Sequence, residues 1–152
     1  MKLSRSEVVT MYNSFKDTNL LGMSTKCKKA FIVNAIKLKP ISDKIIEENT
    51  SVSEKLKTVE YDNAAKKYFK AKADNDANKT EETSKALIDA LKEFEPLFKD
   101  MENKINDAVS ALDQEFEVSL VDIPMNDFLE YLEKAGIDFS FNSILIFQNL
   151  LK

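Results

Sequence analysis

The residue types that carry out most enzyme chemistry are nearly absent from this chain. It contains no histidine and a single cysteine, Cys27. Without an imidazole there is no base for a serine or cysteine nucleophile and no nitrogen ligand for zinc. Cys27 lies on an apolar stripe, which predicts a small core residue in a reducing compartment.

The remaining candidates for chemistry are carboxylates and glycines. The pairs Glu47/Glu48 and Glu81/Glu82 are adjacent in sequence, so their side chains diverge around a helix and form no carboxylate dyad. The two glycines, Gly22 and Gly136, cannot form a phosphate-binding loop. Carboxylate chemistry with a bound magnesium ion stays open. We expect a protein that is not an enzyme, with no catalytic, cofactor-binding or metal-binding residues.

The composition predicts long helices. The chain has 152 residues, of which 43% are apolar, so it can bury a core of about one domain. Only two glycines and three prolines interrupt it. No stretch reaches the roughly 18 apolar residues of a membrane span, and the first residues lead straight into an amphipathic pattern without a signal region. We therefore expect a cytosolic protein and no membrane partner.

The charges are divided unevenly. Residues 1–57 hold 11 Lys/Arg against 6 Asp/Glu, a balance of +5, and residues 58–152 hold 11 against 20, a balance of -9. The basic half could lie against the acidic half, or both could face solvent. A functional alternative is that the acidic C-terminal third forms a docking face for a basic partner. The lysines at 26–44 could contact nucleic acid, but Arg5 is the only arginine and the aromatic residues fall on apolar faces, so the sequence argues against a nucleic-acid partner.

The N-terminal residues predict a short helix within 1–22. Ser4 and Glu7 have the spacing of a capping box, and Gly22 marks a turn. Between the capping box and this turn, apolar residues recur on one helical face: Val8, Met11, Tyr12 and Phe15.

A second helix is expected over 24–73, capped by Ser24 and kinked near Pro40. An alternative is a break at Asn49–Ser51. The helix carries a stripe with steps of four and three residues: Cys27, Phe31, Asn34, Leu38, Ile41 and Ile45. Asn34 either fixes the register of a buried contact or faces a wet edge.

The polar run 74–80 predicts the tip of a hairpin, with Thr80 capping the next helix. The next helix carries three heptads of apolar seam: Leu87, Leu91, Phe94, Phe98, Met101, Ile105, Ala108 and Leu112. Two such stripes joined by a short tip predict an antiparallel hairpin over 24–112. A dimeric coiled coil is the alternative.

Residues 113–152 predict a small α/β cap. Residues 116–123 alternate apolar and polar types as in a strand, which would pair with 137–141 or lie against the hairpin. Asn126 is expected to cap a helix that ends at Gly136. The apolar tail from Ile144 to Leu151 either packs into the core or contacts another chain.

Several short segments resemble a family of small proteins encoded by tailed bacteriophages. They are Met1–Arg5 with Met11–Asn13, Ala35–Pro40, and Leu112–Leu120 with Ile123 and Pro124 close behind. The region between 40 and 110 departs from the family pattern. The family has no assigned activity, so the resemblance implies a phage or prophage origin, in the host cytoplasm or the virion, and no catalytic residues.

Together these features predict a mainly α fold with minor β structure in a single domain. The expected function is a phage interaction or structural protein, as a virion component, assembly factor or accessory protein, with a protein partner that could be a second copy. The alternative is an inhibitor of a host factor that docks through the acidic C-terminal third. The candidate partner contacts are Phe139, Phe141, Phe147, Leu151, Glu130 and Glu133.

Overall fold

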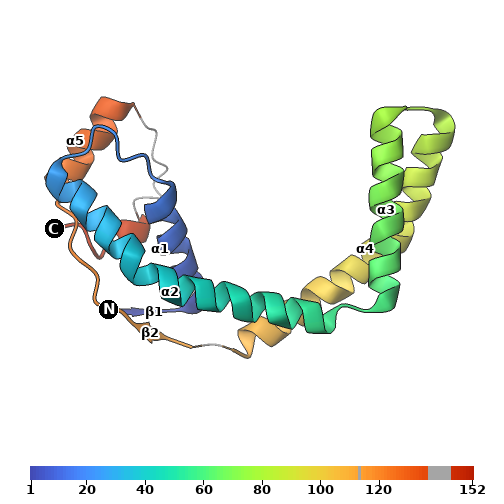
Figure 1. Cartoon of the computed structure of the whole chain (residues 1–152), viewed down its shortest axis with the longest axis horizontal. Helices are drawn as coiled ribbons and strands as arrows, with labels where there is room; N and C mark the ends of the chain where they lie inside the picture. Colours follow the sequence, from blue (N-terminus) through green and yellow to red (C-terminus); the bar gives the residue numbers. More distant parts are fainter. Residues whose placement is uncertain (113, 137–144) are drawn as a thin grey trace. The chain divides into compact units, whose positions relative to one another are not determined.

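The computed structural model describes residues 1–112, 114–136 and 145–152, and this part of the chain is mainly helical (Figure 1). The prediction of a mainly α fold with minor β structure is therefore confirmed. The elements in chain order are β1 (Lys2–Leu3), α1 (Arg5–Asp17), α2 (Thr25–Leu56), α3 (Val59–Ala77), α4 (Glu81–Ser110), β2 (Phe116–Glu117) and α5 (Met125–Ala135).

The chain divides into two compact units. One combines residues 1–48 with residues 113–152, and we call it the terminal unit. The other comprises Asn49–Leu112, and we call it the hairpin unit. The predicted two-helix hairpin over 24–112 is wrong in extent, because this range forms three helices and the apolar stripe of α2 belongs to the core of the terminal unit.

The core of the terminal unit forms around the stripe of α2. Phe31 is fully buried and its ring lies 5.1 Å from that of Phe15, 5.5 Å from that of Phe128 and 5.3 Å from that of Phe147. These rings come from α1, α2, α5 and the C-terminal segment, so four separate parts of the chain meet at one point. Such contacts are worth more than their buried area alone.

A two-stranded antiparallel sheet joins the N-terminus to the segment that follows α4. Lys2 pairs with Glu117 and Leu3 with Phe116, and the Met1 amino group and carbonyl bond to Val118. The expected strand over 116–123 is therefore shorter than predicted, and its partner is the N-terminus. The other expected partner, 137–141, lies outside the described residues.

Asn34 takes the place of a strand partner at Val121. Its side chain is fully buried, donates from Nδ2 to the Val121 carbonyl at 2.9 Å and accepts at Oδ1 from the Val121 amide at 2.7 Å. One amide side chain thus satisfies both polar groups of a backbone unit that would otherwise be unpaired. Of the two expectations for Asn34, the buried position and not the wet edge is the one observed.

Most predicted helix ends are confirmed. Ser4 and Glu7 form the capping box of α1, the Ser24 hydroxyl accepts from the Cys27 amide at 3.1 Å, and Gly136 ends α5 with a φ of 58°, a conformation that favours glycine. The predicted cap at Asn126 is wrong. The N-cap of α5 is Pro124, whose carbonyl accepts from the Phe128 amide.

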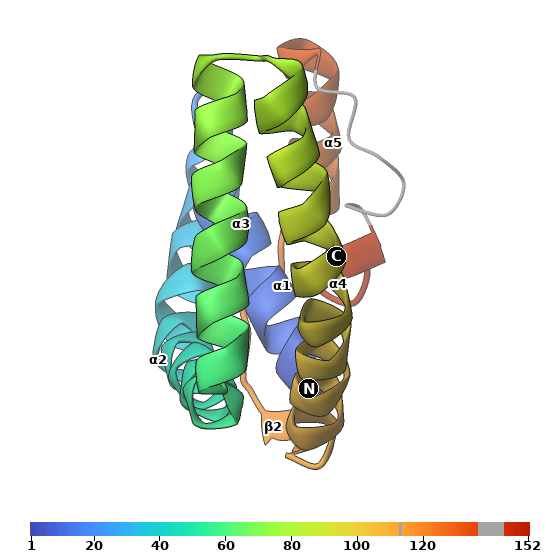
Figure 2. The same ribbon diagram turned by 90° about the vertical axis from the view of Figure 1, so that its right-hand side faces the viewer.

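In the hairpin unit, α3 and α4 run side by side and antiparallel in both views (Figures 1 and 2). The helix expected to reach residue 73 ends at Leu56, and α3 begins after Thr58, whose hydroxyl accepts from the Tyr61 amide. The tip is also shorter than predicted, since α3 continues to Ala77. Asn75 remains helical and accepts bonds from Thr83 and Ser84, so this part of the polar run forms a contact between the helices.

Candidate functional site

The predicted partner contacts of the C-terminal region divide into three groups. Phe139 and Phe141 lie outside the described residues. Glu130 and Glu133 are exposed on α5, and Glu130 forms an ion pair with Lys134. Phe147 and Leu151 belong to the core and its edge.

Phe147 is therefore not a surface contact, which corrects that prediction. Its side chain has no exposed area, and its ring lies 4.8 Å from that of Phe15. Leu151 is partly buried and forms a parallel bridge with Ile123. The apolar tail was expected either in the core or on another chain, and in its described part Phe147 and Leu150 take the first position, whereas Leu145 is 39% exposed.

Cys27 is a buried thiol held in its neutral form. Burial, with a smaller contribution from the charge of Asp127, raises the pKa of Cys27 to about 11. Asp127 itself accepts a hydrogen bond from the Ser24 hydroxyl at 2.5 Å. A thiol that stays protonated and inaccessible at neutral pH is a poor nucleophile, which agrees with the predicted core role.

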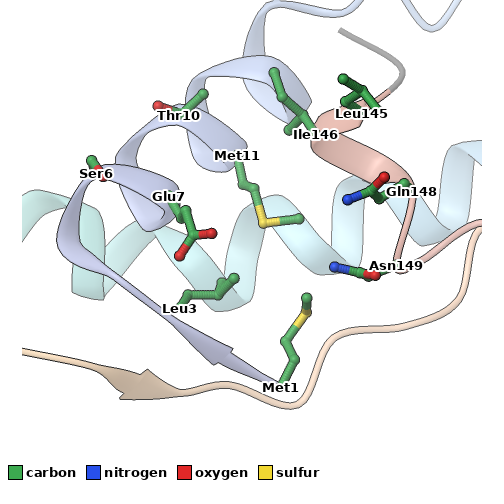
Figure 3. Close-up of a pocket in the computed structure, with 10 residues that line it drawn as sticks. All are labelled: Met1, Leu3, Ser6, Glu7, Thr10, Met11, Leu145, Ile146, Gln148 and Asn149. Atoms are coloured by element: carbon green, nitrogen blue, oxygen red, sulfur yellow. The ribbon is translucent and has the colours of Figure 1, made fainter. Parts of the chain in front are cut away.

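A pocket of about 300 Å³ opens in the terminal unit between α1, the N-terminus and the C-terminal segment (Figure 3). The side chains of Met1, Leu3 and Met11 point toward its centre. Its polar lining comes mainly from Ser6, Glu7, Thr10, Gln148 and Asn149.

Two polar groups of this pocket, those of Ser6 and Glu7, take part in contacts at the N-terminus of α1. The Glu7 carboxylate accepts from the Ser4 amide at 2.7 Å and from the Ser4 hydroxyl at 2.8 Å, and these bonds lower its pKa. The Ser6 hydroxyl contacts that of Ser4 at 3.2 Å. Within the described ranges, no three Cys, Asp or Glu side chains gather as a metal site would require.

A second candidate surface lies on the hairpin unit. Large apolar residues are substantially exposed there, among them Phe69 at 59%, Ile88 at 53%, Leu91 at 40% and Phe98 at 43%, in addition to Val59 and Leu112. On α4, residues 88, 91, 95 and 98 follow steps of three and four and share one face. The Phe94 ring connects the two helices, because it lies 6.2 Å from the ring of Phe69 and 5.7 Å from that of Phe98. We call Phe69, Ile88, Leu91 and Phe98 the hairpin face.

The hairpin face continues into a groove of about 310 Å³. Phe98 contributes to both surfaces, and the groove is further lined by Ser53, Lys57, Tyr61, Met101, Glu102, Ile105 and Asn106. From Ile88 to Ile105 the apolar strip extends about 25 Å along α4, at 1.5 Å per helical residue. This length and shape fit another helix laid along the hairpin.

The predicted seam of α4 is only partly correct. Phe94 and Met101 are buried, but Leu91, Phe98 and Leu112 are exposed, and the buried line runs through Ala90 instead. The sequence signal for a second apolar face was the width of the stripe. Leu87/Ile88, Ala90/Leu91 and Leu97/Phe98 are adjacent apolar pairs, which make an arc too wide for one partner helix to cover.

No family model, no curated protein and no solved structure matches this chain. Within the described part of the chain, no helix combines the length and apolar character needed to cross a membrane.

Proposed function

We propose that this protein is a non-enzymatic interaction or structural protein whose contact surface is the hairpin face. The observation that carries this proposal is the exposure of Phe69, Ile88, Leu91 and Phe98 together on one side of a two-helix unit. Together they expose roughly 390 Å² of apolar surface, taking about 200 Å² for each full side chain. An apolar patch of this size is comparable to the largest one on an ordinary monomer, which is often a functional surface.

The hairpin alone has no means of covering this face. Two packed helices share one interface, along which Ala64, Ala90 and Phe94 are buried. Any further apolar arc on either helix needs a third element. A partner helix would bury the exposed rings and release the water that contacts them, which is the main driving force of helix-in-groove recognition.

The proposed biological setting is a tailed bacteriophage, in which the protein would be a virion component, an assembly factor or an accessory protein. This part of the proposal is supported by the resemblance of the segments Met1–Arg5, Ala35–Pro40 and Leu112–Leu120. An interaction protein without catalytic groups suits each of these roles.

Partner capture by the full-length protein tests the proposal. Tagged wild type, Leu91→Asp and Val59→Asp are incubated with lysate of the cells that produce the protein, and captured chains other than the protein itself are quantified. Val59 is the control, because it is also apolar and 78% exposed, belongs to neither the hairpin face nor the groove, and lies ten residues, about 15 Å along α3, from Phe69. Leu91→Asp should reduce capture at least tenfold and Val59→Asp should not. Equal capture by all three proteins would contradict the proposal.

A second candidate, a host-factor inhibitor that docks through the acidic C-terminal third, is favoured by the exposed side of α5. Met125 and Leu129 are exposed there beside Glu130 and Glu133, which combines apolar anchors with negative charge. Charge-steered docking should weaken steeply between low and high salt. Capture that is lost in Glu130→Lys/Glu133→Lys but unaffected by Leu91→Asp would favour this candidate over the hairpin face.

A further inference from the structure

We infer that the occupant of the hairpin face is the hairpin face of a second copy of this chain, so that two hairpins form an antiparallel four-helix bundle. The inference rests on the proposed function, in which this face is the contact surface. It adds the identity of the partner and the arrangement of the two copies.

The register of the hairpin fixes which residues of α3 and α4 lie at the same level. Lys67 forms an ion pair with Glu93, and the ring of Tyr68 stacks on that of Phe94 at 5.1 Å. These two contacts place Asp62 level with Lys99, Lys66 level with Glu95, and Asp76 level with Lys85, since antiparallel helices advance residue for residue in opposite directions.

These level residues line the two edges of the hairpin face. On α3, residues 62, 66, 69, 73 and 76 follow steps of four and three, and on α4 residues 85, 88, 92, 95 and 99 do the same, so each set shares one side of its helix. The Lys67–Glu93 pair lies on the side of the hairpin opposite the hairpin face. Lys67 directly precedes Tyr68 and Glu93 directly precedes Phe94, and these two rings meet between the helices. Among the described residues Lys66 has no ion-pair partner in its own chain, although Glu95 pairs with Lys99 at 2.7 Å.

A two-fold axis parallel to the hairpin makes these edges complementary. It keeps every residue at its own level and brings α3 of one copy against α4 of the other, as in a four-helix bundle. Lys66 then faces Glu95 of the second copy, Asp62 faces its Lys99, and Asp76 faces its Lys85. None of these three pairs brings like charges together. Phe69 lies between the levels of Lys66 and Asp76, where it is level with Lys92 of the second copy and next to its Leu91.

The apolar area is sufficient for a specific contact. Two hairpin faces would together bury roughly 780 Å² of apolar surface, which is close to the nonpolar share of the smallest standard interfaces of around 1,200 Å². A second copy is present wherever the protein is made, and one surface on each copy is enough for a closed two-fold dimer. We therefore expect a reversible dimer of modest affinity.

Charge exchange between copies tests the arrangement. Asp62→Lys/Lys66→Glu changes the α3 edge, and Glu95→Lys/Lys99→Glu changes the α4 edge, and neither double variant changes the net charge. Each variant alone would place like charges opposite one another at four contacts in the dimer. An equimolar mixture of the two variants would restore opposite charges at all four contacts, whereas clashes within one hairpin would persist in the mixture.

The measurement is sedimentation equilibrium of the full-length protein over a wide concentration range. Wild type should approach twice the monomer mass of 17.3 kDa. Each variant should dissociate with a Kd raised about tenfold or more, given modest contributions from several rim ion pairs, and the mixture should regain the wild-type Kd. Circular dichroism confirms that each variant is folded.

Two results would overturn the inference: a wild type that stays monomeric at the highest concentration, or two variants that do not recover on mixing. A monomer whose capture of other proteins still depends on Leu91 would overturn only this inference and leave the proposed function standing. A dimer unaffected by Leu91→Asp, with no capture that depends on Leu91, would contradict both.

Discussion

The terminal unit and the hairpin unit bury their aromatic side chains to different extents. In the terminal unit Phe31, Phe128 and Phe147 are fully buried, because segments from both ends of the chain surround α2. In the hairpin unit only Phe94 is buried, and Phe69 and Phe98 on either side of it are exposed. A core that is enclosed on several sides stabilises its own fold, whereas a single helix pair leaves apolar surface for another chain. This difference predicts where substitutions act on folding and where they act on association.

The largest difference is expected between Phe31→Ala and Phe98→Ala. Phe31→Ala leaves a cavity among three other rings and should lower the free energy of unfolding of the terminal unit by about 3–5 kcal/mol. Phe98→Ala removes a side chain that is already part-solvated in one chain and should cost about 1 kcal/mol or less in the monomer.

Denaturant unfolding followed by circular dichroism, with hydrogen exchange to assign the loss to each unit, measures both effects. Wild type at the same low concentration is the reference, so that association does not contribute. If Phe98→Ala destabilises the monomer as strongly as Phe31→Ala, the contrast between an enclosed core and a half-covered helix pair is incorrect.

The next largest effect is expected at Asn34. Asn34→Leu keeps the size of the side chain but leaves the amide and the carbonyl of Val121 without their partner. The two bonds are part-buried, so each unpaired group should cost about 1–2 kcal/mol, in the lower half of the range for buried groups, and the total loss should be about 2–4 kcal/mol. Faster hydrogen exchange at residues 118–123 should accompany it. Asn103→Leu, an exposed change on α4, is the control and should alter neither quantity.

A smaller effect, confined to alkaline pH, is expected from Cys27. Its pKa rises from 9.0 to about 11 on folding, so the unfolded chain loses this proton at a lower pH than the folded chain. The associated stability is fully present below pH 9 and declines as the pH rises to 11, by about 2–3 kcal/mol at the upper end. Cys27→Ala should lack this part of the decline. Identical pH dependence of the two proteins would show that the thiol is not held neutral by the fold.

These contrasts also explain which features could be predicted from the sequence. Caps at Ser4, Ser24 and Thr80 depend on a few neighbouring residues, and the buried role of Cys27 follows from its place on an apolar stripe. The stripe of α2 was visible, but periodicity shows which side of a helix is apolar and not which element covers it. Its partners, Phe128 and Phe147, lie about 100 residues away, so the sequence favoured the nearer seam of α4.

The same reason explains the result for the candidate contacts. Phe147 and Leu151 were candidate contacts because the tail is apolar on nearly every side, and the same property suits a segment enclosed by a core, which was the other expectation. The exposed residues Phe69 and Leu91 carry ordinary seam spacing and could be recognised only from the width of the apolar arc. The buried bond between Asn34 and Val121 depends on a backbone group, which no residue pattern marks.

The smallest effect compares two capping boxes, one in each unit. In α1 the backbone amide of Ser4 donates to the Glu7 carboxylate, and in α4 that of Thr80 donates to the Thr83 hydroxyl at 2.9 Å. Bonds to Ser4 lower the pKa of Glu7, so its contribution is present above the ordinary value of 4.5 and is lost as the pH falls through the lower folded value. Glu7→Gln should therefore cost about 0.5 kcal/mol at neutral pH, a usual value for a charge at a helix N-terminus, and nothing at low pH. Thr83→Val replaces an uncharged hydroxyl, so its cost should be the same at both pH values, as measured by thermal unfolding. A cost of Glu7→Gln that persists unchanged in acid would mean that the carboxylate acts by size and not by charge, and the two boxes would then be equivalent.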